Sequence, residues 1–532
     1  MKKPRVIHPF LIAVFPALFF VTYNIGEVSL SRIDAILIAI AMPLVAWMLC
    51  LLLTRILKDN QKAGLLVSLF FLISFSYTPV YNFLLTVFKF EADFNSFFNG
   101  VVLDKLLFSS SFILLFGLGY WVIRTRSSLS NVTRIVNIFA ICLISLSVVK
   151  FGFYQARNYP VLRKNYRPDE IEKKFDGGRG VEDTDENLPD IYYIVPDWCA
   201  SRESLKEFFD YDNSGFIDYL RGKGFFVPDE SYTNYPKTSW SLASSLNFRY
   251  LNELSEFDRE GIVDLNPLNQ MIKYHRVGVF LRSRGYRYIH LASGDNERTD
   301  KSPLADVNLS STSITELMIS FYELTMFHRL ARFFDLEYDS RRVRHRRVLY
   351  TFDKLHEISE SDSYRPKFVF AHILLPHYPE VFEADGRIKT EENKRRENFK
   401  KRYLDAVKFA NKQLMELVDK ILAGSKRPPL IVIQADEGPP PARFRQDERD
   451  FDWEKATAAE LREKFGILNA CYLPGLDRDR LYPGITPVNT FRLIFNQYFH
   501  AGYDLLPDRN YTFVKILSPY KFIDVTEKLG KN

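Results

Sequence analysis

The sequence predicts a protein of two parts. An N-terminal α-helical bundle of about five membrane spans comes first, and an α/β domain with a doubly wound, mostly parallel sheet follows. Two observations carry this prediction. Apolar runs of membrane length crowd the first ~155 residues, and short apolar strands alternate with helical stretches from residue 189 onward. We therefore divide the chain into a transmembrane anchor domain (1–153), a juxtamembrane linker (154–188) and a C-terminal domain (189–532).

The composition excludes several classes of protein. Charged residues make up 26% of the 532, an ordinary share for a folded chain, which excludes wholesale disorder. The net charge of +6 is small beside 71 basic and 65 acidic residues and gives no case for nucleic-acid binding. Four cysteines are too few for a disulfide framework, and no CxxC pair suggests a zinc module.

Five apolar runs are long enough to cross a bilayer, which takes about 17–25 residues. They are 9–28, 33–54, 65–88, 106–123 and 134–153. The first could be a secretory signal peptide, since Lys2, Lys3 and Arg5 precede it. No small-residue cleavage site follows it, however, and four more spans do, which favours a retained span.

The loops between the spans set the orientation. One set carries nine basic residues, namely Lys2, Lys3, Arg5, Arg55, Lys58, Lys62, Arg124, Arg126 and Arg134. The alternate loops carry three, Arg32, Lys89 and Lys105, offset by acidic residues. The positive-inside rule then places the N-terminus in the cytoplasm, and five crossings place the C-terminal domain outside the cytoplasmic membrane.

The linker 154–188 is polar and contains proline and a Gly-Gly pair. Its basic first half could contact anionic lipid headgroups, although a solvated linker is the favoured interpretation.

Nearly unbroken apolar strands in the C-terminal domain predict a sheet covered on both faces. The expected strands are 190–195, 286–291, 367–373, 430–434 and 468–473. The expected helices are 214–223, 239–247, 268–284, 346–359 and 391–422.

Polar side chains follow three of the predicted strands. Asp197 follows the first, His372 lies at the end of the third and His377 follows it, and Asp436 with Glu437 follow the fourth. In open α/β sheets the carboxyl ends of the strands form the site. Carboxylates gathered there repel one another unless a cation lies among them, and an oxygen-rich set favours Mg²⁺, Mn²⁺ or Ca²⁺ over Zn²⁺.

A candidate nucleophile lies in the stretch 234–247. Pro236 and small polar residues predict a turn that opens a helix, with Thr238 at or near the N-cap. Free backbone amides and the helix dipole favour an anion there, and a metal can lower the pKa of the hydroxyl. The plainer interpretation is an ordinary threonine cap.

Together these segments resemble the alkaline phosphatase superfamily, in particular its membrane-anchored sulfatase-like, or lipoteichoic acid synthase-like, branch. The residues that carry the resemblance are Pro189 to Asp197, Asn234 to Thr238 with the stretch up to Asn247, Phe370 to His377, and Gln434 to Pro439. Their order and spacing match over most of 189–500, and the five-span anchor also looks like that branch.

The resemblance implies a role for each position. Asp197 and Asp436 would be metal ligands, and Thr238 would bridge to the metal and form a covalent phospho-enzyme. His377 would act as hydrogen-bond donor or general acid at the phosphate, and His372 would share that role or pack beneath the sheet.

The chain departs from the family pattern in two places. The family's Asp-His-Gly stands here as Asp436-Glu437-Gly438. Glu437 can still ligate a hard cation such as Mn²⁺ or Mg²⁺, but its charge beside a phosphate needs offsetting, for which Lys237 and Arg202 are candidates. No Cys/Ser-x-Pro-x-Arg motif stands at 236–245, which disfavours sulfatase activity.

The expected function is therefore metal-dependent transfer or hydrolysis of a phosphodiester by an enzyme of the cell envelope. One divalent metal, Mn²⁺ or Mg²⁺, would activate Thr238 against a membrane lipid headgroup, and phosphoglycerol or phosphoethanolamine would pass to an envelope polymer, a lipid or water. The rival is a catalytically degenerate membrane protein that binds an envelope glycan or a partner. A weaker rival is a secreted phosphatase with one signal anchor.

Two further features leave alternatives open. Cys199 and Cys471 could pair outside the cytoplasm, or remain buried free thiols, which is slightly favoured. The basic run 341–347 could receive an anionic headgroup, although a solvated basic face is the commoner explanation.

Overall fold

A computed structural model describes most of the chain. The described residues are 4–23, 33–88, 100–165, 188–258, 264–294, 296–311, 316–333, 340–361, 363–390, 393, 396–448, 450–476 and 480–530. The chain forms two compact units: residues 1–160 with 314–339, and residues 161–313 with 340–532. The stretch 314–339, inside the range expected for the C-terminal domain, thus clusters with the N-terminal helices.

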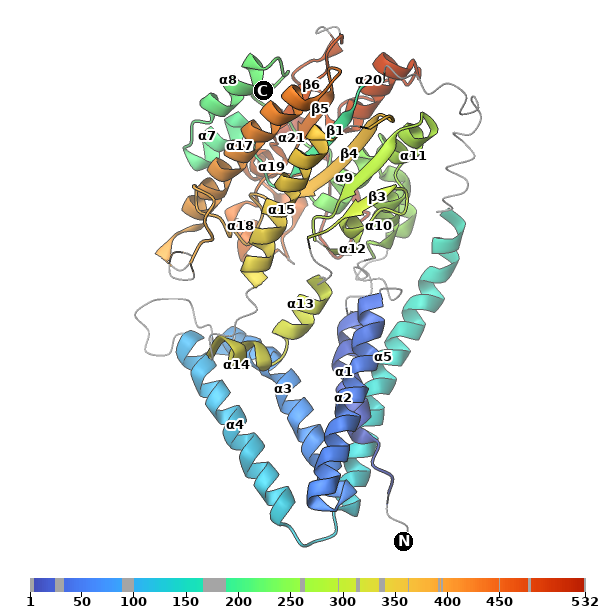
Figure 1. The fold of residues 1–532 in the computed structure, drawn as a ribbon, viewed down its shortest axis with the longest axis vertical. Coiled ribbons are helices and arrows are strands. Elements are labelled where there is room, and N and C mark those ends of the chain that lie inside the picture. The colour runs from blue at the N-terminus through green and yellow to red at the C-terminus, as the bar shows by residue number, and fades with distance from the viewer. Residues whose placement is uncertain are drawn as a thin grey trace. The chain divides into compact units, whose positions relative to one another are not determined.

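The first unit is built from five apolar helices (Figure 1). They are α1 (His8–Tyr23), α2 (Ile33–Leu57), α3 (Asn60–Phe88), α4 (Gly100–Arg124) and α5 (Ser130–Asn165). Four of them are long and apolar enough to cross a membrane, and the described α1 is shorter, at 16 residues. The predicted bundle is confirmed as four to five apolar helices. Part of the predicted first span, residues 24–28, lies outside the described residues, and α5 continues beyond the predicted end of the last span.

Two short helices of the later stretch pack on α3. They are α13 (Glu316–Glu323) and α14 (Phe327–Phe333). The backbone amide of Met326 donates to the Ser74 carbonyl at 2.9 Å, and the Thr78 hydroxyl donates to the Glu323 carbonyl at 2.8 Å. Arg329 forms an ion pair with Asp104 at 3.3 Å. These polar contacts explain why this stretch belongs to the helical unit.

The second unit is built on a six-stranded sheet of order β3-β2-β4-β1-β5-β6. Its strands are β1 (Ile191–Pro196), β2 (Arg287–Leu291), β3 (Val307–Leu309), β4 (Lys367–Ile373), β5 (Leu430–Gln434) and β6 (Asn469–Tyr472). All neighbours pair in parallel except β5 with β6. The mostly parallel sheet is confirmed, and the three-residue β3 is an addition to the predicted strands.

Helices cover both faces of this sheet, so that its central strands are buried on both sides. Tyr193 faces a core shared with α9 (Thr238–Ser245), α10 (Asn266–Lys273), α11 (Arg276–Ser283), α19 (Ala458–Phe465) and α20 (Pro487–Phe499). Tyr192, its neighbour in the chain, faces a core shared with α8 (Ser214–Gly222), α15 (Ser340–Glu360) and α17 (Phe399–Gly424). The doubly wound arrangement is confirmed; α15 and α17 cross one face of the sheet in Figure 1.

The remaining elements are short. They are α7 (Arg202–Phe209), α12 (Asn296–Asp300), α18 (Ala442–Gln446), α21 (Thr526–Leu529), the 3-10 turns Asn252–Phe257 and Trp453–Lys455, and the hairpin of β7 (Tyr511–Phe513) with β8 (Phe522–Asp524).

Two predicted helices have different boundaries because of local capping. The helix expected at 268–284 is two helices, since His275 is extended and its ring nitrogen accepts the Gly278 amide, which starts α11. In the range 391–422, helix α17 begins at Phe399, where the Asn398 side chain accepts the Lys401 amide at 2.9 Å. Residues 391, 392, 394 and 395 of the predicted helix lie outside the described residues. The helix expected at 346–359 begins earlier, at Ser340.

The buried His275 predicts a loss of stability in acid. Its Nδ1 accepts the Gly278 amide at 2.9 Å and its Nε2 meets the Tyr288 hydroxyl at 3.0 Å. Burial, with the charge of His290, lowers the pKa of His275 to about 3. The unfolded state therefore takes up a proton first as the pH falls below about 6.5, and this histidine costs up to about 1.4 kcal/mol of unfolding free energy per pH unit down to about pH 3. Urea unfolding at several pH values checks this. In His275→Gln, the slope of the unfolding free energy against pH below about pH 6.5 should be smaller by about one proton.

Candidate active site

The carboxyl ends of three adjacent strands, β4, β1 and β5, meet at one edge of the sheet. Asp197 follows β1, and its amide donates to the Ile373 carbonyl at the end of β4, at 2.9 Å. His372 lies on β4 beside Val195, and Asp436 comes two residues after β5. His372 Nε2 is 3.3 Å from Asp197 Oδ2 and 3.7 Å from Asp436 Oδ2. The structure therefore brings these three predicted side chains together.

Both aspartates are buried without hydrogen-bond donors. Asp197 and Asp436 are 1% and 2% exposed, and none of their four carboxylate oxygens has a hydrogen-bond partner among the described residues. Neither nitrogen of His372 has one either. Buried carboxylates are normally paired, hydrogen-bonded or bound to a metal. The donor set therefore fits a hard divalent cation between Asp197 and Asp436.

The protonation of this cluster follows from its charges. Burial and the charge of Asp197 raise the pKa of Asp436, and the neighbouring His372 and Thr238 side chains oppose that rise. Burial lowers the pKa of His372, but its contacts with Asp197 and Asp436 outweigh burial and raise the pKa to about 10. Without a metal, a protonated His372 therefore supplies the positive charge next to the two carboxylates.

Thr238 lies at the start of α9, beside Asp436. The extended Lys237 is the N-cap, so that Thr238 is the first helical residue, one position later than a cap. The side chain of Thr238 is buried with the rest of α9. Arg298 of α12 donates to the Ser239 hydroxyl at 2.6 Å, which places a guanidinium next to this helix start. A hydroxyl, free helix amides and a cationic side chain therefore converge where a phosphate could bind.

Glu437 has a hydrogen-bond donor at one oxygen and an ion-pair partner at the other. The indole of Trp198 donates to Oε1 at 3.0 Å, and Lys464 Nζ lies 3.0 Å from Oε2. His377 completes this side of the site: its Nε2 is 4.0 Å from Asp197 Oδ2, and its ring centre is 4.2 Å from the Trp198 ring. The His377 side chain is 28% exposed, so that it can meet a substrate from outside.

The two cations predicted to offset Glu437 have other partners. Lys237 forms an ion pair with Glu448 and lies 5.1 Å from the centre of the Phe444 ring. Arg202 binds Asp229 at 2.9 Å, a carboxylate that Arg221 also binds. Among the described residues Arg202 makes no contact with the Asp197–Asp436 pair. The offsetting cation at Glu437 is instead Lys464.

Four residues of the site were not found from the sequence: Trp198, Arg298, Glu448 and Lys464. Trp198 has a positive φ of 67°, which is unusual for a bulky residue and turns its indole towards Glu437. Its position directly after Asp197 was the one available signal. Arg298, Glu448 and Lys464 lie on segments that carry no motif.

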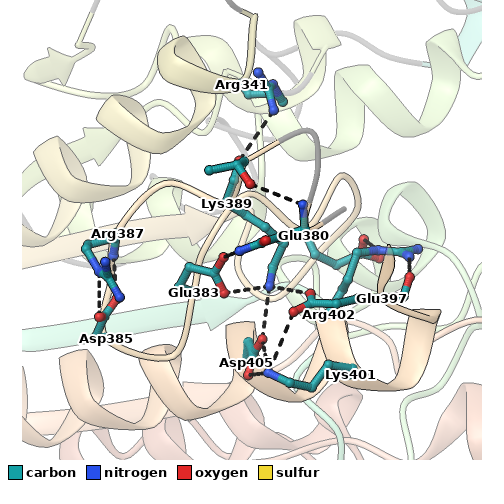
Figure 2. Close-up of polar contacts among 12 residues, drawn as sticks. Arg341, Glu380, Glu383, Asp385, Arg387, Lys389, Glu397, Lys401, Arg402 and Asp405 are labelled. Carbon is teal, nitrogen blue, oxygen red and sulfur yellow. Dashed lines mark hydrogen bonds and ion pairs between the residues drawn. The ribbon is translucent and has the colours of Figure 1, made fainter. Parts of the chain in front are cut away.

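A second acidic cluster holds a lysine at its centre (Figure 2). Glu383, Glu397 and Asp405 lie close enough together to hold a metal ion. The Lys389 ammonium, whose side chain is 1% exposed, binds them at 2.7, 2.6 and 2.9 Å. Burial lowers the pKa of Lys389, but the three hydrogen bonds outweigh it and raise the pKa. We therefore interpret this cluster as structural.

The cysteines near the site, Cys199 and Cys471, are both free and buried. Burial raises the pKa of each thiol to about 12, which makes both poor nucleophiles.

Comparison with known proteins agrees with this geometry. Residues 208–465, which include Thr238, His372 and Asp436, match the family model described as Sulfatase. No curated protein matches the sequence.

Solved structures with a similar fold have low sequence identity to this chain. The C-terminal periplasmic domain of EptC from Escherichia coli, in complex with Zn, is 12% identical over 64% of this chain and 94% of that chain, with a TM-score of 0.42. The integral membrane protein lipooligosaccharide phosphoethanolamine transferase A (EptA) from Neisseria meningitidis is 11% identical over 92% of this chain and 94% of that chain, with a TM-score of 0.38. The lipoteichoic acid synthase LtaP from Listeria monocytogenes is 13% identical over 67% of this chain and 85% of that chain, with a TM-score of 0.36.

The site residues lie in the second unit of the chain, as does the family match apart from its residues 314–339. Residues 208–465 of the chain therefore carry a domain of the Sulfatase family.

Proposed function

We propose that this protein is a metal-dependent phosphotransferase of the cell envelope. It would move a phosphoethanolamine- or phosphoglycerol-type group from a membrane phospholipid to an envelope acceptor, through a phosphothreonine at Thr238. The observation that carries the proposal is the buried pair Asp197 and Asp436, without hydrogen-bond donors and beside the Thr238 hydroxyl.

The charges of the site support one divalent cation. Lys464 pairs with Glu437, and Lys237 pairs with Glu448, so that these four charges cancel. Asp197 and Asp436 then leave two negative charges, beside which His372 holds a proton in the metal-free site. One Mn²⁺ or Mg²⁺ between the two carboxylates would replace that proton and balance both charges. Asp197, Asp436 and Thr238 would hold this ion. When bound, it would lower the pKa of the Thr238 hydroxyl and offset the charge of the phosphate.

The chain's own groups would carry the rest of the reaction. The Thr238 oxygen would attack the phosphorus of the donor, forming a P–O bond to Thr238 and breaking the P–O bond to the diacylglycerol. His377 would give a proton to the departing oxygen, and Arg298 with the first amides of α9 would hold the phosphate oxygens. An acceptor hydroxyl would then attack the phosphothreonine, break its P–O bond to Thr238 and return a proton to His377. The proton that Thr238 gives to solvent on activation would be taken up again when Thr238 is released. Water in place of the acceptor would make the enzyme a hydrolase.

The apolar helices of the first unit support a location in the bilayer. We place the protein in the cytoplasmic (inner) membrane, with its N-terminus in the cytoplasm and its C-terminal domain outside. A lipid donor would then be available in the same membrane, which favours transfer over hydrolysis.

Intact-mass spectrometry tests the proposal. Full-length protein in detergent, loaded with Mn²⁺, would be mixed with phosphatidylethanolamine or phosphatidylglycerol and quenched in acid. We expect a mass gain of one phosphoethanolamine or phosphoglycerol group, mapped by peptide sequencing to Thr238 and absent after chelation of the metal. No gain together with no bound Mn²⁺ would contradict the proposal and favour the non-catalytic, polymer-binding alternative.

A further inference from the structure

Lys464 of α19 is a buried cation next to Glu437. Its side chain is 1% exposed, and its ammonium lies 3.0 Å from Glu437 Oε2, donates to the Gly438 carbonyl at 2.9 Å and lies 5.5 Å from the Trp198 ring centre. A lysine so deeply buried is rare unless it is paired. Glu437 is its acidic partner here.

Backbone contacts also hold the loop that carries Glu437 against the end of α19. The Gly438 amide donates to the Lys464 carbonyl at 2.8 Å, so that the two residues are joined in both directions. A Cβ at position 438 would lie 2.5 Å from the Glu463 carbonyl oxygen and 2.9 Å from that of Lys464. Only glycine permits this approach of the loop after β5 to the end of α19, which keeps Glu437 facing Lys464.

The two kinds of carboxylate in the site contrast sharply. Glu437 accepts the Trp198 indole on Oε1 and forms an ion pair with Lys464 at Oε2. The four oxygens of Asp197 and Asp436 have no hydrogen-bond donor among the described residues, and His372 Nε2 lies 3.3 and 3.7 Å from the two carboxylates. With Lys464 present, the three acids and the lysine sum to two negative charges. Without it they would sum to three, in a buried region where charge interactions are strong.

We propose that Lys464 is a positioning residue that holds Glu437 as a neutral ion pair, so that Glu437 adds no net charge to the site where Asp197 and Asp436 would bind one divalent cation. This inference rests on the proposed function. It assigns Glu437 a supporting role in place of the ligand role predicted from the sequence.

Mn²⁺ binding to the metal-stripped, full-length protein in detergent tests this inference, by equilibrium dialysis at fixed pH and without substrate. The wild type should bind about one Mn²⁺. Lys464→Met should bind Mn²⁺ at least tenfold more tightly, because Glu437 is left without its cation. Glu437→Gln should bind at least tenfold more weakly, because the Lys464 charge is then unopposed.

The double variant Glu437→Gln/Lys464→Met decides the matter. It should return to within threefold of the wild-type affinity, since the site again carries two negative charges. Lys464→Arg, which keeps the charge, should also stay near wild type. A double variant as weak as Glu437→Gln alone would show that Glu437 is a direct ligand and would overturn the inference.

Melting temperatures of the same metal-free proteins separate this inference from the proposed function. Each single charge removal should lower the melting temperature, and the double variant should recover most of the loss. If the wild type binds no Mn²⁺ while the double variant still recovers, the proposed function fails and the ion pair stands. If the wild type binds Mn²⁺ and the double variant recovers neither affinity nor melting temperature, the ion-pair inference fails and the proposed function stands.

Discussion

Replacing Thr238 by alanine is expected to lower the rate of headgroup transfer by at least about 10⁴-fold. The hydroxyl of Thr238 is the one that α9 places beside the buried Asp436, and covalent catalysis stops when its nucleophile is removed. The measurement is transfer from a fluorescent phosphatidylethanolamine or phosphatidylglycerol by full-length protein with Mn²⁺. The covalent mass gain of the wild type should disappear together with the activity.

A matched variant separates loss of the nucleophile from loss of the helix start. Thr238→Ser keeps the hydroxyl and should retain measurable transfer and the mass gain, shifted by the lost methylene. Both variants should keep the wild-type melting temperature within a few degrees, because the first helical position tolerates small residues. A covalent adduct that persists in Thr238→Ala would refute the assignment of the nucleophile.

Replacing Lys389 by methionine is expected to lower the unfolding free energy by about 3–5 kcal/mol, the usual cost of leaving buried charges without their partner. The Lys389 ammonium binds Glu383, Glu397 and Asp405, and its side chain is 1% exposed (Figure 2). Methionine fills a similar volume, so that the loss reports charge rather than a cavity. Urea unfolding of the full-length protein in detergent measures it.

The neighbouring Lys401 supplies the control. It binds the same Asp405 carboxylate, at 2.6 Å from Oδ1, but its side chain is 56% exposed. Lys401→Met should therefore cost at most about 1 kcal/mol, as exposed ion pairs do. Equal losses of unfolding free energy in the two variants would show that the burial of Lys389 is not the reason why its ion pairs stabilise the fold.

The sequence was most informative where the backbone is regular. Strands β4 and β5 lie at the predicted residues, because a strand buried on both faces is an unbroken apolar run. The parallel pairing of β1 with β4 and β5 then follows from the alternation of strands and helices. That pairing is why Asp197, His372 and Asp436, far apart in the chain, could be expected at one edge.

The sequence was less informative where a single capping side chain sets the boundary of a helix. The break between α10 and α11 depends on the His275 cap, and the start of α17 on Asn398. Neither cap changes the apolar periodicity, so that a pattern of apolar residues continues across both. The stretch 314–339 shows the same limit, since its membership of the helical unit rests on contacts with Ser74, Thr78 and Asp104.

By itself the sequence determined the two-part architecture, the sheet and the residues at its strand ends, because these follow from local periodicity and parallel pairing. Only the tertiary structure decided how the charges of the site are matched. Lys464 reaches Glu437 from α19, and Arg298 reaches Ser239 from α12, whereas Arg202 binds Asp229. These ion pairs join side chains that are distant in the chain, and they produce no periodic pattern in the sequence. Only the packing of the elements therefore shows which carboxylates have a cationic partner and which are left to bind a metal.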